Sequence, residues 1–255
     1  MKISNFGIIL YPSTRSLAYL HMLSTNNILP KEAIVMGKWP FLPNDILLEA
    51  KKYSYAEKYF SLNDNLELLI KHKDINLSLI DSTDINSQEI REALSKAECK
   101  NFIFTGGGIL KKEVLSLDID FIHVHPGDIN YYRGSTCFHY SYLNKQSVSC
   151  TTFIMRKELD RGEVLDISHI HQNIFIENDQ SFFIDYIYDP FIRSISLKKL
   201  FPHLENLKKK KKIRINKFYG HDHYVIHPVL RSLFIKKINN SYRMNDKKGI
   251  YIIDA

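Results

Sequence analysis

Short apolar runs alternate with amphipathic stretches through the first two-thirds of this chain, and no other feature limits its fold so strongly. The apolar runs predict strands at residues 6–10, 33–37, 77–80, 101–105 and 121–125. The stretches between them predict helices at 15–23, 66–71, 87–96 and 110–117. This order predicts an α/β fold, with a twisted, mainly parallel sheet that carries helices on both faces. In such sheets, ligands bind beyond the carboxyl ends of the strands.

The rest of the chain predicts fewer regular elements. A helix is expected at 135–143, a pair of strands at 150–155 and 163–170, and a helix at 181–200 that Pro190 interrupts. From Pro202 onward the sequence turns basic and loses the alternation. We therefore predict a main domain at 1–195 and a short C-terminal appendage at 196–255, since so short a segment is marginal as an independent domain.

The charge of the chain favours anionic partners. Its formal net charge of +7 suits phosphates, nucleotide sugars, folates or RNA, without choosing among them. Much of the excess comes from the lysine run at 208–212, which we interpret as a solvated surface segment rather than a nucleic-acid site.

The cysteines and the apolar segments predict the compartment. The three cysteines, Cys99, Cys137 and Cys150, have no CxxC spacing, and an odd number argues against a disulfide framework. The apolar stretch at 6–10 is too short for a signal peptide. No stretch approaches the roughly 20 apolar residues that span a bilayer. We expect a cytoplasmic protein without a membrane partner.

His123 and His125 form the first candidate site. Residues two apart in a strand face the same side, so both imidazoles share one face and Val124 points into the opposite layer. Pro126 ends the strand, which places the pair at its carboxyl end. Two imidazoles at this edge indicate function, although one of them can instead be a structural histidine.

Two further segments are candidates beside the histidines. Gly106, Gly107 and Gly108 lie between a strand and a helix, where bare backbone lets a ligand approach closely. Their pattern is not a dinucleotide or phosphate-loop fingerprint, and a tight turn is the alternative. Asp160 lies in a turn before Gly162, which is ordinary turn chemistry unless Asp160 meets His125 in space.

Taken together, residues 104–165 resemble the folate-dependent formyltransferases, which include the glycinamide ribonucleotide, methionyl-tRNA and sugar N-formyltransferases. The signature of that family runs N-x-H-P, Y-R-G and L-D-x-G. The matching residues here are His123-Val124-His125-Pro126, Tyr132-Arg133-Gly134 and Leu159-Asp160-Arg161-Gly162. The resemblance implies a Rossmann-like catalytic domain that uses 10-formyltetrahydrofolate as its cosubstrate. It places the catalytic histidine at His125 and the catalytic aspartate at Asp160.

The expected chemistry is the attack of an unprotonated amine on the formyl carbon. A protonated His125 would stabilise the oxyanion and relay a proton to the departing folate nitrogen, with Asp160 favouring the charged ring. The family's asparagine falls on His123, which is a departure, and we hypothesise that His123 replaces it as the oxyanion donor. The resemblance also places the folate pterin against backbone of the glycine segment and of the later turn, at Gly107, Gly108, Ile109, Leu110, Lys157 and Glu158.

The acceptor is inferred from the layout of the chain. The tail at 196–255 is too short for the C-terminal barrel of the tRNA enzymes. A catalytic domain with a short appendage most resembles enzymes that formylate amino sugars for surface polysaccharides. The basic charge suits a nucleotide-linked amino sugar. By the same resemblance we expect a homodimer.

Three alternatives stay open. A metal-dependent hydrolase would use His123, His125 and Asp160 as ligands. A 10-formyltetrahydrofolate hydrolase would pass the formyl group to water. A folate- or nucleotide-binding module would bind without turnover. A further cluster, His221, His223 and His227, matches no zinc spacing, and we expect no metal there but a packed edge near the acceptor.

Overall fold

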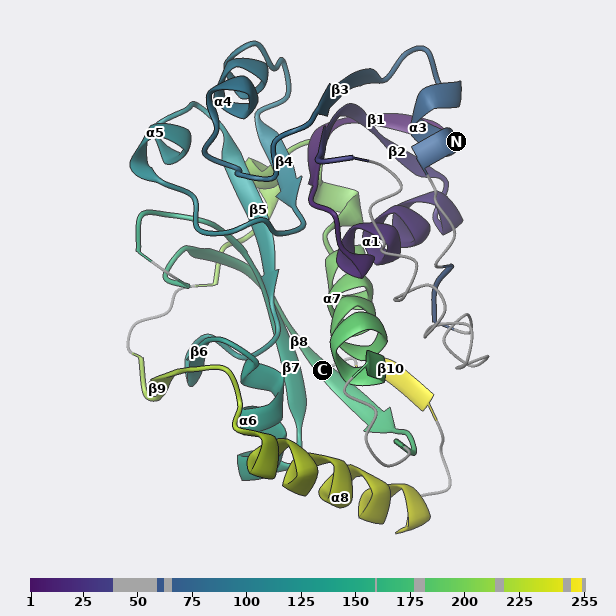
Figure 1. The fold of residues 1–255 in the computed structure, drawn as a ribbon, viewed down its shortest axis with the longest axis vertical. Coiled ribbons are helices and arrows are strands. Elements are labelled where there is room, and N and C mark those ends of the chain that lie inside the picture. Colours follow the sequence, from purple (N-terminus) through teal and green to yellow (C-terminus); the bar gives the residue numbers. More distant parts are fainter. Residues whose placement is uncertain are drawn as a thin grey trace.

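A computed structural model of the chain describes residues 1–38, 59–61, 66–158, 160–176, 182–213, 218–244 and 249–253 (Figure 1). The strands are β1 (Lys2–Leu10), β2 (Ile28–Met36), β3 (Asn76–Ile80), β4 (Asn101–Phe104), β5 (Asp120–His125), β6 (Tyr132–Gly134), β7 (Val148–Ile154), β8 (Glu163–Asn173), β9 (His221–His223) and β10 (Gly249–Ile253). The α-helices are α1 (Thr14–Thr25), α3 (Leu66–Lys71), α4 (Gln88–Ser95), α5 (Lys112–Leu115), α6 (Cys137–Lys145), α7 (Asp189–Lys198) and α8 (Pro228–Met244).

Within the described residues, one large sheet has the strand order β10-β8-β7-β5-β4-β1-β2-β3. The strands from β3 to β5 pair in parallel, whereas β7, β8 and β10 continue the sheet with antiparallel pairing. The parallel part has the doubly wound order in which the chain reverses direction between β1 and β4. The predicted fold class is therefore confirmed, and the reversal point marks where a ligand crevice is expected.

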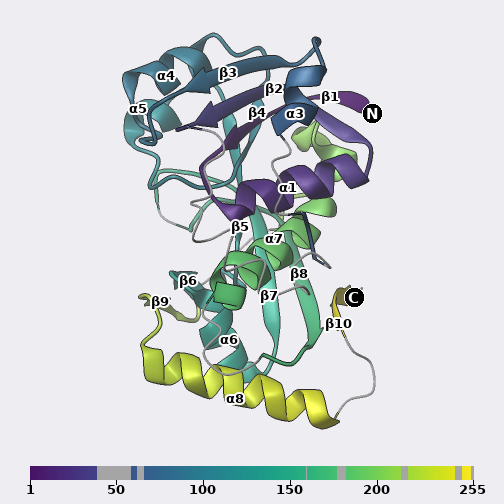
Figure 2. The same cartoon turned by 45° about the vertical axis from the view of Figure 1, so that its right-hand side comes forward.

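Alternate side chains of each strand enter different layers. Ile8 and Leu10 of β1 belong to the core formed with α1 and α7, while Ile9 belongs to the core formed with α4 and α5. Figures 1 and 2 show these two pairs of helices on opposite faces of the parallel strands. A strand that is buried on both sides has to be apolar at successive positions, which explains the continuous apolar runs of the sequence.

The predicted elements agree with the observed ones except at a few ends. Helix α5 is shorter than the expected 110–117, because Leu110 is not helical but packs into the core beside the glycine segment. The expected helix at 181–200 begins as a π-helical turn (Phe183–Tyr188) and continues as α7. Pro190 follows the change from π-helical to α-helical backbone, so the helical segment is continuous and Pro190 accompanies a change of helix type rather than a break. Ser181 and Leu159 lie outside the described residues.

The sequence did not predict the elements beyond residue 213. Strand β9 pairs in parallel with the short strand β6, and β10 pairs with β8 at the edge of the main sheet. Helix α8 packs along α6 and contributes Phe234 and Ile238 to the main core. Figure 2 shows α8 lying across the end of the molecule beneath α6. The boundary at 195/196 stays a prediction.

Candidate active site

A cleft of about 250 Å³ opens at the carboxyl ends of β4 and β5, beside the point where the sheet reverses. The glycine segment after β4 forms one wall, and the turn after β7 forms another. The cleft is lined by Arg15, Phe104, Gly106, Gly107, Gly108, Ile109, Leu110, Leu115, His123, Phe153, Met155, Arg156, Lys157, Glu158 and Asp160. Every predicted site residue except His125 is therefore on this surface.

The glycine segment needs its glycines for conformational and steric reasons. Gly107 has a φ of +117°, and a Cβ there would lie 2.8 Å from the Tyr11 ring. Gly108 has a φ of +108°, but a Cβ on it would meet no atom within 4 Å. Its backbone thus faces open space, and neighbouring Ile109 is 68% exposed. The segment offers bare peptide groups and one apolar side chain to a flat, polar-edged ligand.

His125 and Asp160 meet at the inner wall of the cleft. Asp160 Oδ2 lies 3.6 Å from His125 Nδ1 and accepts a 2.8 Å hydrogen bond from the Gly134 amide. His125 Nε2 lies 3.0 Å from the Tyr132 carbonyl oxygen, which can only accept. His125 is 2% exposed and Asp160 8%, and only Asp160 lines the cleft. Asp160 therefore stands between the cleft and the buried imidazole.

His123 occupies the cleft wall itself. Its ring contacts Phe153 edge-on at 5.9 Å and packs beside Phe104 at 6.0 Å between centroids. Its Nδ1 lies 3.4 Å from the Phe104 carbonyl oxygen. Val124, between the two histidines, packs into the opposite core. Both imidazoles thus share one face of β5, as the strand periodicity predicts.

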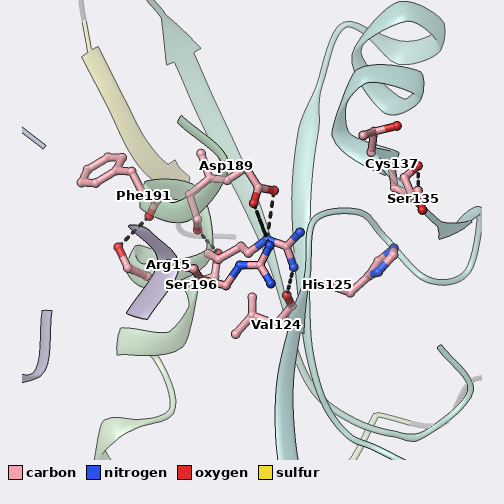
Figure 3. A network of polar contacts seen from close by, with 12 residues as sticks. Arg15, Val124, His125, Ser135, Cys137, Asp189, Phe191 and Ser196 are labelled. Atoms are coloured by element: carbon pink, nitrogen blue, oxygen red, sulfur yellow. Dashed lines mark hydrogen bonds and ion pairs between the residues drawn. The ribbon is translucent and has the colours of Figure 1, made fainter. Parts of the chain in front are cut away.

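A buried charge network lies on the other side of β5 (Figure 3). Arg193 of α7 donates from Nε to Asp189 at 2.9 Å and from Nη1 to the Val124 carbonyl at 2.6 Å. Along antiparallel strands, hydrogen-bonded and non-hydrogen-bonded residue pairs alternate. Phe121 is hydrogen-bonded to Met155 of the β7 side, so Val124, three residues later on β5, is in a non-hydrogen-bonded pair and its carbonyl points away from β7. Strand β4, the neighbour on the other side of β5, ends before it reaches Val124 and offers no backbone N–H to this carbonyl. Arg193 donates the hydrogen bond instead.

Arg15 completes the network from α1. Its Nη2 lies 3.3 Å from Asp189 Oδ2, and its Nη1 donates to the Thr105 carbonyl at 2.9 Å. Two guanidinium groups therefore share one carboxylate, which leaves an excess positive charge beside the cleft. Burial raises the pKa of Asp189, but Arg193 and Arg15 outweigh it and hold that pKa below its usual range.

The network and the burial together disfavour charged imidazoles. Burial, then Arg193 and Arg15, hold the pKa of His123 well below 6.5. Burial also lowers the pKa of His125, against the opposing effect of Asp160. The protonated His125 expected from the sequence is therefore not the form that this structure favours. A separation of 3.6 Å is too long for a hydrogen bond and is consistent with a neutral ring that donates only to Tyr132.

Several residues of the site were missed by the sequence interpretation. Asp189 and Arg193 are four residues apart on α7, a spacing that indicates an ion pair, but no local pattern joins that pair to Arg15 after β1. A basic residue directly after the first strand of a doubly wound sheet is the one signal that could have indicated Arg15, since that turn faces the crevice.

The remaining sequence candidates do not line the cleft. His223 packs against Tyr140 at 4.4 Å, and His221 is exposed. Four of the five lysines at 208–212 are exposed, and Lys212 contacts Glu163. Across the described ranges, no three His, Cys, Asp or Glu residues group as a metal site would require. The helices described in the structure include none that is long and apolar enough to span a membrane.

The fold is that of the N-formyltransferases. A sugar N-formyltransferase from Shewanella sp. superposes with a TM-score of 0.53, at 13% identity, over 91% of this chain and 87% of its own. A 4-N formyltransferase from Francisella tularensis gives 0.52, at 12% identity, over 92% and 87%. A phosphoribosylglycinamide formyltransferase from Anaplasma phagocytophilum gives 0.50, at 13% identity, over 86% and 98%. No protein-family model and no curated protein matches the sequence.

Proposed function

We propose that this protein is an N-formyltransferase that moves the formyl group of 10-formyltetrahydrofolate onto an amine. The observation that carries the proposal is the meeting of Asp160 and His125 beside the bare glycine backbone, in a chain with the fold of N-formyltransferases. These residues are 35 positions apart in the sequence, and the fold brings their side chains to 3.6 Å. An ordinary turn aspartate would have no reason to face a buried imidazole.

Asp160 and His125 are proposed to handle the first proton. An amine acceptor is largely an ammonium ion at neutral pH, and it must lose one proton before it can attack. Asp160 on the cleft wall attracts that cation, and the proton passes to Nδ1 of the neutral imidazole behind it. The charged ring then has acceptors on both sides, the Tyr132 carbonyl and the carboxylate. Protonation of the ring offsets the negative charge of Asp160 on the cleft wall, which reduces the repulsion between that carboxylate and the oxyanion of the tetrahedral intermediate.

The folate is proposed to lie along the glycine segment and the turn that faces it. The pterin edge would bond backbone at Gly107 and Gly108, and its face would cover Ile109 and Leu110. Lys157 and Glu158 line the same cleft, and they are proposed to complete the binding site. The open space over Gly108 and the exposure of Ile109 support this assignment.

The acceptor is proposed to be a nucleotide-linked amino sugar. The net charge of +7 suits a phosphorylated acceptor, and the sugar N-formyltransferase from Shewanella sp. matches most of both chains. A cytoplasmic location and a homodimer stay predictions, and light scattering of the purified protein tests the second.

The test is incubation of the purified protein with 10-formyltetrahydrofolate and a panel of nucleotide-linked amino sugars, with mass spectrometry of the products. A formyl-sized mass gain on one acceptor, and its loss in Asp160→Asn, is the expected result. Release of formate without an acceptor identifies a hydrolase. Folate binding with no release and no transfer identifies a binding module, and activity that depends on added metal identifies a metal-dependent hydrolase. Any of these last three outcomes contradicts the proposal.

A further inference from the structure

His123 is held in one orientation on the cleft wall. Phe153 meets its ring edge-on, and Phe104 packs at its side and supplies the carbonyl that faces Nδ1. Because aromatic neighbours fix the plane of the ring, the position of each nitrogen is determined by the fold rather than by solvent.

The Phe104 carbonyl determines the tautomer of His123. A carbonyl oxygen only accepts hydrogen bonds, so Nδ1 has to carry the hydrogen in this 3.4 Å contact. A neutral imidazole has one N–H, and Nε2 is therefore left with a lone pair. Among the described residues none forms a hydrogen bond with Nε2. Nε2 is thus a free proton acceptor on a residue that lines the cleft.

The charges around His123 keep this ring neutral. Arg193 of α7 and Arg15 of α1 are the cations whose charges act on His123, and Asp189 neutralises only one of them. His125 on the same strand also lowers the pKa of His123. Asp160 and Glu158 are the carboxylates among the residues that line the cleft. Burial adds to the arginines, and together they place the pKa of His123 well below 6.5, so the acceptor form persists at neutral pH.

We propose that Nε2 of His123 accepts the proton that the acceptor amine gives up after it attacks the formyl carbon. This inference rests on the proposed formyl transfer. It gives His123 the role of a base. The asparagine at this position in the related family is a neutral hydrogen-bond donor, and the sequence alone suggests the same donor role for His123. A donor at Nε2 would need a hydrogen there, and a neutral ring could then no longer donate to Phe104.

The proton balance of the reaction accommodates this step. The acceptor ammonium ion loses its first proton to the Asp160–His125 pair. The amine nitrogen then forms a bond to the formyl carbon and becomes positively charged. His123 Nε2 takes one proton from it and delivers that proton to N10 of the folate as the bond between N10 and the formyl carbon breaks. One proton leaves with tetrahydrofolate, the other returns to water from His125, and no oxidant or further reactant is needed.

The two roles of His123 make opposite predictions for His123→Asn. If His123 is a base, Asn cannot replace it, and kcat should fall by about 100-fold. Added imidazole should restore part of the activity of His123→Ala, more strongly as pH rises and free base accumulates. If His123 is a donor, Asn should support turnover as in the related family. A kcat of His123→Asn within about threefold of the wild-type value overturns the inference, because loss of a general base lowers the rate by far more than threefold.

Controls separate this inference from the proposed function and from misfolding. Binding of 5-formyltetrahydrofolate and the thermal midpoint of His123→Asn should stay close to wild type, since Asn is smaller and polar. If the wild type transfers no formyl group, the proposed function fails. If the wild type is active and His123→Asn is equally active, only the present inference fails.

A direct measurement does not depend on turnover. Histidine labelled with ¹⁵N reports the tautomer by NMR, because a protonated ring nitrogen and one with a lone pair resonate far apart. We expect the His123 signal to show N–H at Nδ1 and a lone pair at Nε2 at pH 7, with His123→Asn used to assign it. A hydrogen on Nε2, or on both nitrogens, at this pH overturns the inference.

Discussion

His123 and His125 sit on the same face of the same strand, yet the fold gives them different surroundings. His123 packs between phenylalanine rings on the cleft wall and has an open Nε2. His125 is 2% exposed, and each of its nitrogens faces a protein acceptor, at Tyr132 or at Asp160. One ring can exchange a proton with a ligand directly, and the other can do so only through Asp160.

The difference arises from the segments that lie over each residue at the edge of the sheet. At the level of His123, β4 has just ended, and the glycine segment opens the space in front of the ring. At the level of His125, the chain turns back through β6, so Tyr132 and Gly134 close over the imidazole and Asp160. Strand periodicity determines the direction in which a side chain points, but the neighbouring loops determine whether it meets ligand or protein.

The strongest test of this comparison is Asp160→Asn, which removes the carboxylate between the cleft and His125. Asn keeps an oxygen for the Gly134 amide and tolerates the left-handed φ of +50° at this position, so the fold should be retained. We expect kcat to fall by about 100-fold or more, because the amide cannot accept the proton of the ammonium ion. The pKa of His125 should also decrease, since Asp160 raises it.

Steady-state kinetics with the identified acceptor measures the first effect, and ¹⁵N NMR of His125 measures the second. Arg161→Gln is a matched control, because it changes one charge beside the same residue on an exposed side chain. If Asp160→Asn keeps at least a third of the wild-type kcat, the proposal that His125 receives its proton through Asp160 is wrong.

Much of this arrangement could be predicted from the sequence. The apolar runs placed the parallel strands, and the spacing of His123 and His125 placed both rings on one face. The partner of His125 was also identified, but only because the signature of a known family joined positions 125 and 160. Local physical chemistry alone assigns Asp160 to an ordinary turn.

The rest depends on contacts that no local pattern encodes. Arg15 and Asp189 are 174 positions apart, and neither shows in the sequence that it has a buried partner. Strand β6 is three residues long and forms only because β9, far along the chain, pairs with it. Helix α8 was missed because its buried residues, such as Phe234 and Ile238, are few beside the many polar ones. The relative exposure of His123 and His125 depends on these same distant segments.

The charge network can be tested by Arg193→Met, which should destabilise the protein and raise the pKa of His123. The variant leaves Asp189 buried with only Arg15 as a partner, and it leaves the Val124 carbonyl without its donor. We expect the free energy of unfolding to fall by about 3 kcal/mol, as when one partner of a buried ion pair is removed. The pKa of His123 should rise, because Arg193 is the largest influence on it after burial.

Urea unfolding measures the stability, and an NMR titration of both histidines measures the pKa changes. The double variant Asp189→Leu with Arg193→Met is the matched control. It removes the buried carboxylate together with its main partner and should lose less stability than Arg193→Met alone. A double variant that is less stable than the single one would show that Asp189 has another stabilising role.

A third histidine, His139, lies outside the site and serves as a reference for the two histidines of β5. Its titration is expected to change the stability of the protein by less than the Arg193→Met substitution. It lies on α6 and is fully buried, stacked on Phe138 at 4.0 Å and beside Phe234 of α8 at 4.6 Å. Its Nε2 has no partner among the described residues. Burial, with a contribution from Arg231, lowers its pKa to about 3. The unfolded chain takes up a proton on this histidine near pH 6.5, whereas the folded protein does so only near pH 3.

Stability is therefore lost as pH falls below about 6.5, because the unfolded state then binds more protons than the folded state. Between pH 7 and pH 5 this one group should cost roughly 2 kcal/mol. His139→Phe removes the titrating group and keeps an aromatic ring in the same layer. Between pH 7 and pH 5, the free energy of unfolding of this variant should therefore fall by roughly 2 kcal/mol less than that of the wild type. Urea unfolding at both pH values provides the measurement. An equal acid sensitivity in both proteins would show that His139 is not its source.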